Sequence, residues 1–472
     1  MPEFKPLVLP ALFLIKFGYA LFFLYIYTYY YGGGELTADA GKFFNESKIL
    51  HSVFYESPAQ YFKFLFGFNN DPIIIDSYLE ATHHWNAGER FLLNDSRNVI
   101  RVNSVLLFLS NGEVLVHFLF FSLASFLGGI DLYQFVKKHS RLPEGFLLIL
   151  LTLTPSIAFW GSSIIKEPLM ILGLCLVIRA TFDNLSFIGR TSRFLVGGIL
   201  LFGFKPYVLF CLLPAIIFYL IFSKLFKKQW INILLFSAFG FFTLYFSGSL
   251  DKGIHIISKQ QEDFINVRDG GLYLKADPDH YYYIYFENRN YFEIRGNQAV
   301  LLKPVGAYYM RIDNNFDRKS INLTNTGQVF EIGEDMEKAN SGIEVTKIQN
   351  EPLNMLRMIP EVFFNTLVRP IPNEQTNWLQ FLAFLENILI LFGLIMAFIV
   401  KPRSTGYNEN RILISLAIFS VALLCIVGWT TPVVGAIVRY VTPALIGIVL
   451  IIAIKIDSVQ PLRTTFSFMK KN

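Results

Sequence analysis

The sequence has few cysteines and none of the common catalytic signatures. Only three cysteines occur among 472 residues, Cys175, Cys211 and Cys425, and no CxxC spacing is present. All three fall in apolar stretches, which excludes a disulfide framework and predicts buried, small apolar side chains. No Walker loop, HExxH or GxSxG motif occurs, so nothing indicates a P-loop NTPase, a zinc protease or an α/β-hydrolase.

Charged residues are also scarce. They make up 16% of the chain, whereas about a quarter is usual in soluble domains. Hydrophobic residues reach 53%, and phenylalanine alone occurs 49 times. The composition predicts a polytopic α-helical membrane protein. The net charge of +5 needs no nucleic-acid partner, because basic loops on one membrane face explain it.

Apolar runs predict about ten transmembrane helices, counting roughly 20 residues per crossing. The first run is too long for a signal-peptide core and lacks a small-residue cleavage site, so we interpret it as a true span. The fifth run is short for a full crossing. The predicted spans are Leu7–Tyr31, Glu113–Val136, Gly145–Trp160, Pro168–Thr181, Phe194–Phe204, Pro206–Phe222, Trp230–Phe246, Trp378–Val400, Ile412–Gly428 and Val433–Ile456.

With ten crossings, the basic short loops fall on one side, which the positive-inside rule assigns to the cytoplasm. This predicts a multi-pass protein of the cytoplasmic (inner) membrane with both termini in the cytoplasm. Two long polar regions, about 32–112 and 248–377, then face outward. The loop cations are Lys137, Lys138, Arg141, Arg190, Arg193, Lys224, Lys227, Lys228, Lys401, Arg403, Arg411, Lys470 and Lys471.

The polar regions divide the chain into an N-terminal membrane module (1–248), an extracytoplasmic insert (249–376) and C-terminal membrane helices (377–472). The first outer region contains amphipathic helical patterns at Ser57–Phe68, Asp76–Trp85 and Val99–Leu109. In the second, short Tyr-rich runs separated by turn residues predict a small β-rich part, about 262–348, followed by an amphipathic helix at Asn354–Leu367. The insert is a candidate surface for an envelope protein partner.

The stretch "GGGELTADAGKFF" follows the first span on the outer side. Its three glycines allow a tight turn, and Glu35 and Asp39 come directly afterwards. A carboxylate at the boundary between water and lipid is well placed to act as a base or to hold a metal. The alternative is a solvated loop in which Asp39 caps the next helix.

The stretch "LTPSIAFWGSSIIKEPLM" forms a predicted outer turn between two spans. Lys166 and Glu167 precede Pro168, and Trp160 suits the membrane interface. One interpretation is a capped turn, in which Glu167 complements the helix dipole. The other is an anion site made by Lys166 and the helix N-terminus.

Further cations lie on the predicted outer side, against the positive-inside bias. Arg439 and Tyr440 lie inside the last span, where arginine must face protein, lipid phosphate or a ligand; snorkelling to lipid is the alternative. Together these cations would suit a pocket for a lipid-linked phosphate or pyrophosphate. Other residues of this candidate set are Lys205, Arg369, Arg101, Arg97 and the intramembrane Glu386.

One pattern could bind a divalent cation, the only cofactor that the residues suggest. Helical spacing would place Asp76 and Glu80 on one face with His83 or His84. Carboxylate and imidazole groups bind Zn²⁺ and Mn²⁺.

These motifs resemble the C-type fold superfamily of integral-membrane glycosyltransferases, which use polyprenyl-phosphate donors. The resemblance rests on the acidic loop after the first span, on "PSIAFWGSSIIKEPLMILGL" and on the Arg-Tyr-x-x-Pro element of "GAIVRYVTPALIGIVLIIA". It implies Asp39, with Glu35, as catalytic acid–base and Lys166, Lys205, Arg439 and Tyr440 around the donor phosphate. Substrate contacts would come from Arg101, Trp160, Glu167, Arg369 and Glu386.

The resemblance implies transfer of a sugar or glycan from a polyprenyl-linked lipid to a glycan, lipid or protein acceptor during cell-envelope assembly. Paired acids are common in the family's first loop, whereas Ala40 follows Asp39 here. Two alternatives are a surface-polysaccharide polymerase and a non-enzymatic membrane subunit of an envelope or export complex.

Overall fold

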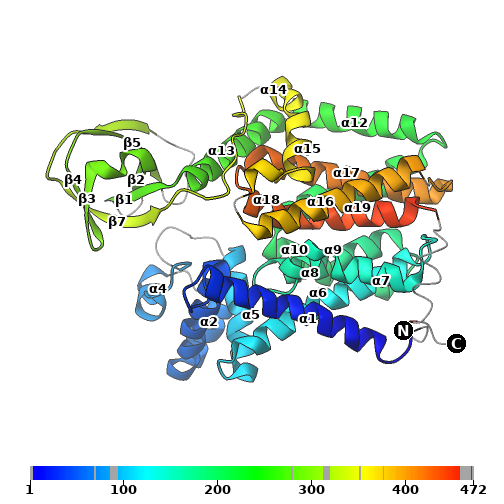
Figure 1. Ribbon diagram of the computed structural model, residues 1–472, viewed down its shortest axis with the longest axis horizontal. Coiled ribbons are helices and arrows are strands. Elements are labelled where there is room, and N and C mark those ends of the chain that lie inside the picture. Colours follow the sequence, from blue (N-terminus) through cyan, green and yellow to red (C-terminus); the bar gives the residue numbers. More distant parts are fainter. Residues whose placement is uncertain are drawn as a thin grey trace.

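The computed structural model describes residues 4–68, 71–85, 94–277, 280–311, 319–349, 352–375, 377–400, 402–457 and 469. Long helices form a bundle, and a small β-sheet projects from one end of it (Figure 1). Within the described ranges, seven helices are long and apolar enough to cross a membrane, and a bent pair would make eight. The protein is therefore a polytopic helical membrane protein with an antiparallel sheet, as predicted.

Seven predicted spans overlap these long helices. A π-helical turn, Ile26–Tyr30, extends the first, and Met396–Val400 extends the α16 span in the same way. The long helices are α1 (Val8–Tyr25), α6 (Val114–Val136), α10 (Phe187–Phe204), α11 (Pro206–Leu220), α12 (Gln229–Phe246), α16 (Trp378–Ile395) and α17 (Tyr407–Thr430).

Prolines break or bend the remaining apolar segments. The predicted third span is divided at Pro155 into α7 (Glu144–Leu153) and α8 (Pro155–Trp160). The last is α18 (Val434–Tyr440) and α19 (Thr442–Lys455), bent by 53° just before Pro443. Proline lacks the N–H that would continue the helix. With α9 (Glu167–Phe182) only 16 residues long, the predicted number of ten crossings is not confirmed.

The prediction of a short fifth span was wrong. Helix α10 begins at Phe187, not Phe194, and is 18 residues long. The Ser186 side chain caps its start, accepting from the Gly189 N–H. Arg190 and Arg193 lie inside its first turns. Because these arginines interrupt the apolar run, hydropathy placed the start of the helix too late. Arg193 donates to the Asp131 carboxylate of α6, 2.8 Å away, which compensates its charge.

The basic loops gather at one end of the bundle, near the N and C labels in Figure 1. Lys138 contacts Asp183 at 2.7 Å, and Arg141 contacts Asp457 at 3.0 Å. The Lys5 N–H donates to the carbonyl of Met469, so both described chain ends lie there. That this end is cytoplasmic remains a prediction of the positive-inside rule; Lys401, Lys470 and Lys471 lie outside the described residues.

Four helices cover the opposite end: α2 (Ala38–Glu56), α3 (Pro58–Leu65), α4 (Pro72–Leu79) and α5 (Asp95–Ser110). They pack through a core that includes Phe43, Tyr61, Leu79 and Val99. The predicted helix at Asp76–Trp85 is wrong, because α4 starts at Pro72 and ends at Leu79.

The insert begins with a long amphipathic helix, α13 (Ser249–Asp269), so the helix includes the first residues of the predicted β-rich part, 262–269. A seven-stranded antiparallel sheet follows, in the order β3-β4-β7-β1-β2-β5-β6. Helices α14 (Pro352–Arg357) and α15 (Ile359–Leu367) then return to the bundle. The strands are β1 (Gly271–Asp277), β2 (His280–Tyr285), β3 (Phe292–Arg295), β4 (Gln298–Leu301), β5 (Val305–Arg311), β6 (Lys319–Leu323) and β7 (Val329–Met336).

Candidate functional site

A glycine turn carries Asp39 back to the end of the first span. Gly33 and Gly34 have φ values of +59° and +113°, which L-residues with side chains rarely adopt. The turn lets the N–H and the hydroxyl of Thr37 both donate to the carbonyl of Tyr27, at 3.1 and 3.0 Å. Thr37 is the N-cap residue of α2, and Asp39 lies in the first turn. Asp39 is thereby fixed beside the C-terminal end of the first span.

Proline junctions position the other charged residues. Glu167 is the first residue of α9, directly before Pro168, and Lys205 separates α10 from Pro206 of α11. Residues before proline avoid the helical region, and Lys205 has φ −153° and ψ 72°. Arg439 is the penultimate residue of α18, next to the bend before α19. The helix breaks thus place charged side chains inside the bundle.

Asp39, Glu167, Lys205 and Arg439 form one ion cluster, which we call the Arg439 cluster. Arg439 Nε and Nη2 donate to the two oxygens of Glu167, at 2.6 and 3.1 Å. Arg439 Nη1 donates to Asp39 Oδ2 at 2.7 Å. Lys205 Nζ lies 3.2 Å from Glu167 Oε1. Residues separated by up to 400 positions therefore meet in one site.

Aromatic rings cover the cations of the Arg439 cluster. Lys205 Nζ lies 4.6 Å from the ring centre of Tyr440, and Arg439 Cζ lies 5.9 Å from the rings of Tyr440 and Trp160. Such contacts stabilise cations away from water. Phe264 of α13 packs edge-on against Tyr440, at 5.9 Å between ring centres. The insert therefore contributes to the surroundings of the cluster.

The four side chains of the cluster carry two positive and two negative charges. The sequence interpretation was a set of cations available to a polyanion, and the structure corrects it, because carboxylates already compensate Lys205 and Arg439. Lys166 is not in the cluster either: its Nζ lies 2.7 Å from Asp95 Oδ1, in the first turn of α5. A phosphate would have to replace a carboxylate rather than fill an uncompensated site.

The two carboxylates differ in accessibility. The Glu167 side chain is 1% exposed, whereas that of Asp39 is 48% exposed. Burial alone would raise the pKa of Asp39, but the Arg439 guanidinium outweighs it and holds the pKa below its ordinary value of 3.8. Asp39 is thus ionised, solvent-accessible and the more easily displaced partner of Arg439.

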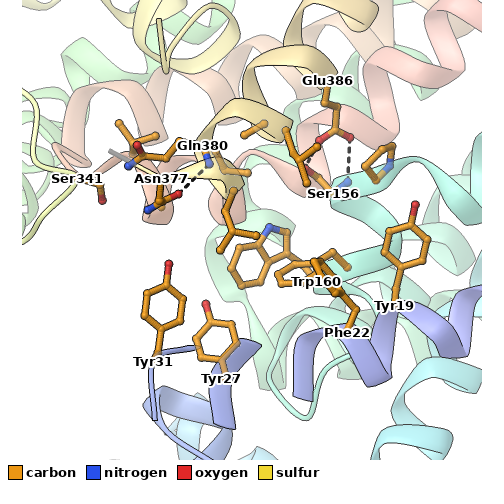
Figure 2. A pocket seen from close by; sticks show the side chains of 18 residues that line it. Tyr19, Phe22, Tyr27, Tyr31, Ser156, Trp160, Ser341, Asn377, Gln380 and Glu386 are labelled. Carbon is orange, nitrogen blue, oxygen red and sulfur yellow. Dashed lines mark hydrogen bonds between the residues drawn. The ribbon is translucent and has the colours of Figure 1, made fainter. Parts of the chain in front are cut away.

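A cavity of about 200 Å³ adjoins the cluster, between α1, α8, α16 and α18. Figure 2 shows Trp160 in the middle of it, with Tyr27 and Tyr31 near one end and Glu386 near the other. Val438, next to Arg439, and Trp160, which the guanidinium faces, both line the cavity. Most of the wall is apolar or aromatic.

Glu386 supports the wall of this cavity. One of its oxygens accepts from the Ser156 N–H at 2.9 Å, and the other accepts from the Ser156 hydroxyl. The contact joins α16 to the first turn of α8, which Pro155 separates from α7 (Figure 2). Glu386 therefore has an internal hydrogen-bond partner, as an intramembrane carboxylate requires.

Three other predicted site residues lie elsewhere. Arg369 Nε pairs with Glu374 Oε1 at 3.0 Å, and Arg101 Nε donates to the carbonyl of Phe64 at 2.9 Å. Glu35 is exposed, directly after the glycine turn. Their contacts are with neighbouring loops and helices rather than with Arg439.

The four metal-ligand candidates do not share one helix face. Asp76 lies in α4, Glu80 follows its end, and His83 and His84 lie beyond it. His84 Nδ1 instead contacts Glu46 of α2, at 2.8 Å. Among the described residues, no group of three or more His, Cys, Asp or Glu side chains could hold a metal ion.

Sequence reasoning missed charged residues that the fold buries or pairs, among them Asp95, Glu46 and Lys16. Asp95 pairs with Lys166, Glu46 holds His84, and Lys16 is only 1% exposed inside α1. Lys16 had a sequence signal, because a lysine in an apolar span is costly and rarely faces lipid. Asp95 and Glu46 had none, since nothing in a polar region of the sequence distinguishes a paired acid from a solvated one.

Comparison with protein-family models, curated proteins and solved structures finds no match for this chain.

Proposed function

We propose that the protein is a membrane glycosyltransferase that moves a sugar from a polyprenyl-phosphate or -pyrophosphate donor to an acceptor on the outer side. The observation that carries the proposal is the ion pair between Asp39, 48% exposed, and Arg439, 16% exposed, beside a largely apolar cavity. This pairs a carboxylate suited to proton transfer with a guanidinium suited to phosphate.

Donor binding would exchange one anion for another. Glu167 holds Arg439 through two nitrogens, so the guanidinium keeps its orientation when Nη1 changes partner. A phosphate oxygen would replace Asp39 on Nη1, and Lys205 is the second cation of the cluster. Losing Arg439 removes the interaction that lowers the pKa of Asp39, so the displaced carboxylate becomes a stronger base. Donor binding would thus activate the base.

The chemical step follows from this arrangement. Asp39 accepts the proton of the acceptor hydroxyl, whose oxygen forms a bond to the anomeric carbon of the sugar. The bond between that carbon and the phosphate oxygen breaks, and its electron pair stays on the leaving phosphate. Arg439 and Lys205 stabilise the charge that develops there, a contribution that is often the largest in such reactions.

The cavity suits the first isoprenoid units of a lipid donor. Phe22, Phe159 and Leu382 line it, and Leu382 is 47% exposed on the lipid-facing side of α16. The remainder of the tail could stay in the bilayer while the phosphate reaches Arg439. The acceptor would approach from the exposed side of Asp39.

The test is release of polyprenyl phosphate by the purified protein in lipid nanodiscs, using a panel of polyprenyl-phosphate hexoses and pentoses. Asp39→Asn should lower kcat about 10²- to 10⁴-fold, the range for loss of a general base. Glu35→Gln is the matched control, since it removes an exposed acid of the same loop and should retain activity. Full turnover by Asp39→Asn would rule out this assignment.

The same assay separates the two alternatives. A polysaccharide polymerase would share the chemistry but give products of many repeats, so product length distinguishes it from single transfer. A non-enzymatic subunit is kept as an alternative because the sheet projects from the bundle (Figure 1). Copurification of a stoichiometric partner, with no effect of Asp39 or Arg439 substitution, would favour it.

A further inference from the structure

A second cavity, of about 480 Å³, lies at the basic end of the bundle, away from the Arg439 cluster. We call it the Arg411 cavity. It lies where α9, α10, α11 and α17 end or begin, and its polar wall includes Arg190, Lys224, Arg411 and Asp183. The mechanism proposed above does not use it.

Arg411 is the buried cation of this cavity, only 8% exposed. Its Nε donates to Ser223 Oγ at 2.7 Å, Nη2 to the Tyr219 carbonyl at 3.0 Å and Nη1 to Asn408 Oδ1 at 3.3 Å. All three acceptors are neutral. Its Cζ also lies 4.5 Å from the Tyr219 ring centre. These contacts orient the guanidinium without compensating its charge.

The exposed cations Arg190 and Lys224 flank Arg411. In the part of the chain that the structure describes, no carboxylate oxygen lies within 4.0 Å of a side-chain nitrogen of these three residues. Arg190 Nη2 donates to the backbone carbonyl of Asp183, at 3.2 Å. The cavity therefore brings three cations together without a paired acid.

The carboxylate in the wall is already engaged. Asp183 Oδ1 lies 2.7 Å from Lys138 Nζ, and Oδ2 lies 3.2 Å from Arg179 Nε. Arg179 and Arg193 share the next acid, Asp131, at 2.5 and 2.8 Å. The surroundings thus hold more cations than carboxylates, which is an electrostatic argument for a bound anion.

The cavity also borders the lipid-facing surface. Leu220 lines it and is 47% exposed, and the neighbouring Ile221 is 57% exposed. Phe187, at the start of α10, is 83% exposed. Exposed apolar side chains beside cations, at the ends of spanning helices, are at the depth where headgroups meet acyl chains.

We infer that the Arg411 cavity binds a phosphate anion, and that the phosphate is the headgroup of an anionic phospholipid. Arginine binds phosphate through paired N–H groups, and basic pockets between membrane helices suit anionic headgroups. Free inorganic phosphate offers the same chemistry without the acyl chains. The inference does not depend on the proposed transferase activity.

The experiment measures lipid binding to the full-length, detergent-solubilised protein by native mass spectrometry. The probes are phosphatidylglycerol, phosphatidylcholine with the same acyl chains, and inorganic phosphate as competitor. The variant Arg190→Gln/Lys224→Gln changes exposed residues only and should weaken phosphatidylglycerol binding about 30-fold, the effect of removing two cations from an anionic-lipid site. The matched control, Lys227→Gln/Lys228→Gln, removes two exposed cations of the loop that follows Lys224, outside the cavity wall, and should leave binding unchanged.

Arg411→Lys provides a second variant, which keeps the charge but loses the paired N–H groups, and should weaken binding about tenfold. Equal phosphatidylglycerol affinity in wild type and both cavity variants would overturn the inference, as would equal binding of phosphatidylcholine and phosphatidylglycerol. Saturable binding of inorganic phosphate that the double variant loses, without lipid binding, would retain the anion site but overturn the lipid assignment.

Discussion

Arg439 and Arg411 are arginines held inside opposite ends of the bundle, and their partners differ. Arg439 contacts two carboxylates, one buried and one accessible, within a cluster of zero net charge. Arg411 contacts a hydroxyl, a carbonyl and a side-chain amide, all neutral. The charge of Arg439 is fully compensated by carboxylates until another anion exchanges with Asp39. Arg411 leaves its charge available to an added anion.

Deleting the guanidinium at each site should give the largest difference in stability between the two sites. Arg439→Met would leave Glu167 buried with Lys205 as its remaining cation, and breaking a buried ion pair costs about 3–5 kcal/mol. Arg411→Met would leave only neutral acceptors without a donor, at a cost of about 1–3 kcal/mol. Thermal unfolding followed by circular dichroism in one detergent checks the order. Equal losses would remove the distinction between the two sites.

A double-mutant cycle would sharpen the comparison. For Arg439→Met with Glu167→Gln we expect a coupling free energy of about 2–3 kcal/mol, because the two charges contact each other in a buried site. For Arg411→Met with Ser223→Ala we expect about 1 kcal/mol or less, the usual net contribution of one hydrogen bond. Unfolding free energies of the single and double variants give both values.

Asp39→Asn should have a smaller effect, about 1 kcal/mol at neutral pH, since half of the Asp39 side chain is exposed and solvent screens the pair. The pKa of Asp39 is lowered in the folded state. Its contribution to stability is therefore present above pH 3.8, the ordinary pKa, and is lost as the pH falls further, through the lowered pKa. The difference in stability between wild type and Asp39→Asn should therefore shrink toward zero at acid pH. A difference that stays constant below pH 3.8 would contradict the pairing.

The smallest effect on stability is expected for Arg190→Gln/Lys224→Gln. Both side chains are exposed, and such substitutions usually change stability by less than about 0.5 kcal/mol. The unfolding midpoint without added lipid should match that of Lys227→Gln/Lys228→Gln. A large loss of stability in the first variant alone would show that these cations support the fold rather than a ligand.

The Arg439 cluster shows how far sequence reasoning reaches. Asp39, Glu167, Lys205 and Arg439 were selected because charge near a predicted span end is costly, and the fold brings all four together. Lys166 met the same criterion but contacts Asp95 instead. The positions of charged residues can be predicted from hydropathy, whereas their pairing cannot, because it depends on how distant helices pack.

The errors in the element predictions have a similar cause. Residues Asp76–Trp85 were predicted to form one helix, but α4 ends at Leu79, and His84 contacts Glu46 of another helix. The start of α10 was placed too late because Arg190 and Arg193 broke the apolar run. In both cases contacts between elements compensate polar groups that local patterns treat as solvated.

The sequence alone determined that this protein is a multi-pass helical membrane protein with a small β-rich insert, because apolar length and strand alternation are local properties. It also placed the break between α10 and α11 at Lys205-Pro206, since proline acts on its own backbone and on the residue before it. Only the tertiary structure decided which charges compensate each other. Ion pairing depends on distances of a few ångströms between segments far apart in the chain, and this left Arg439 paired with two acids and Arg411 with none among the described residues.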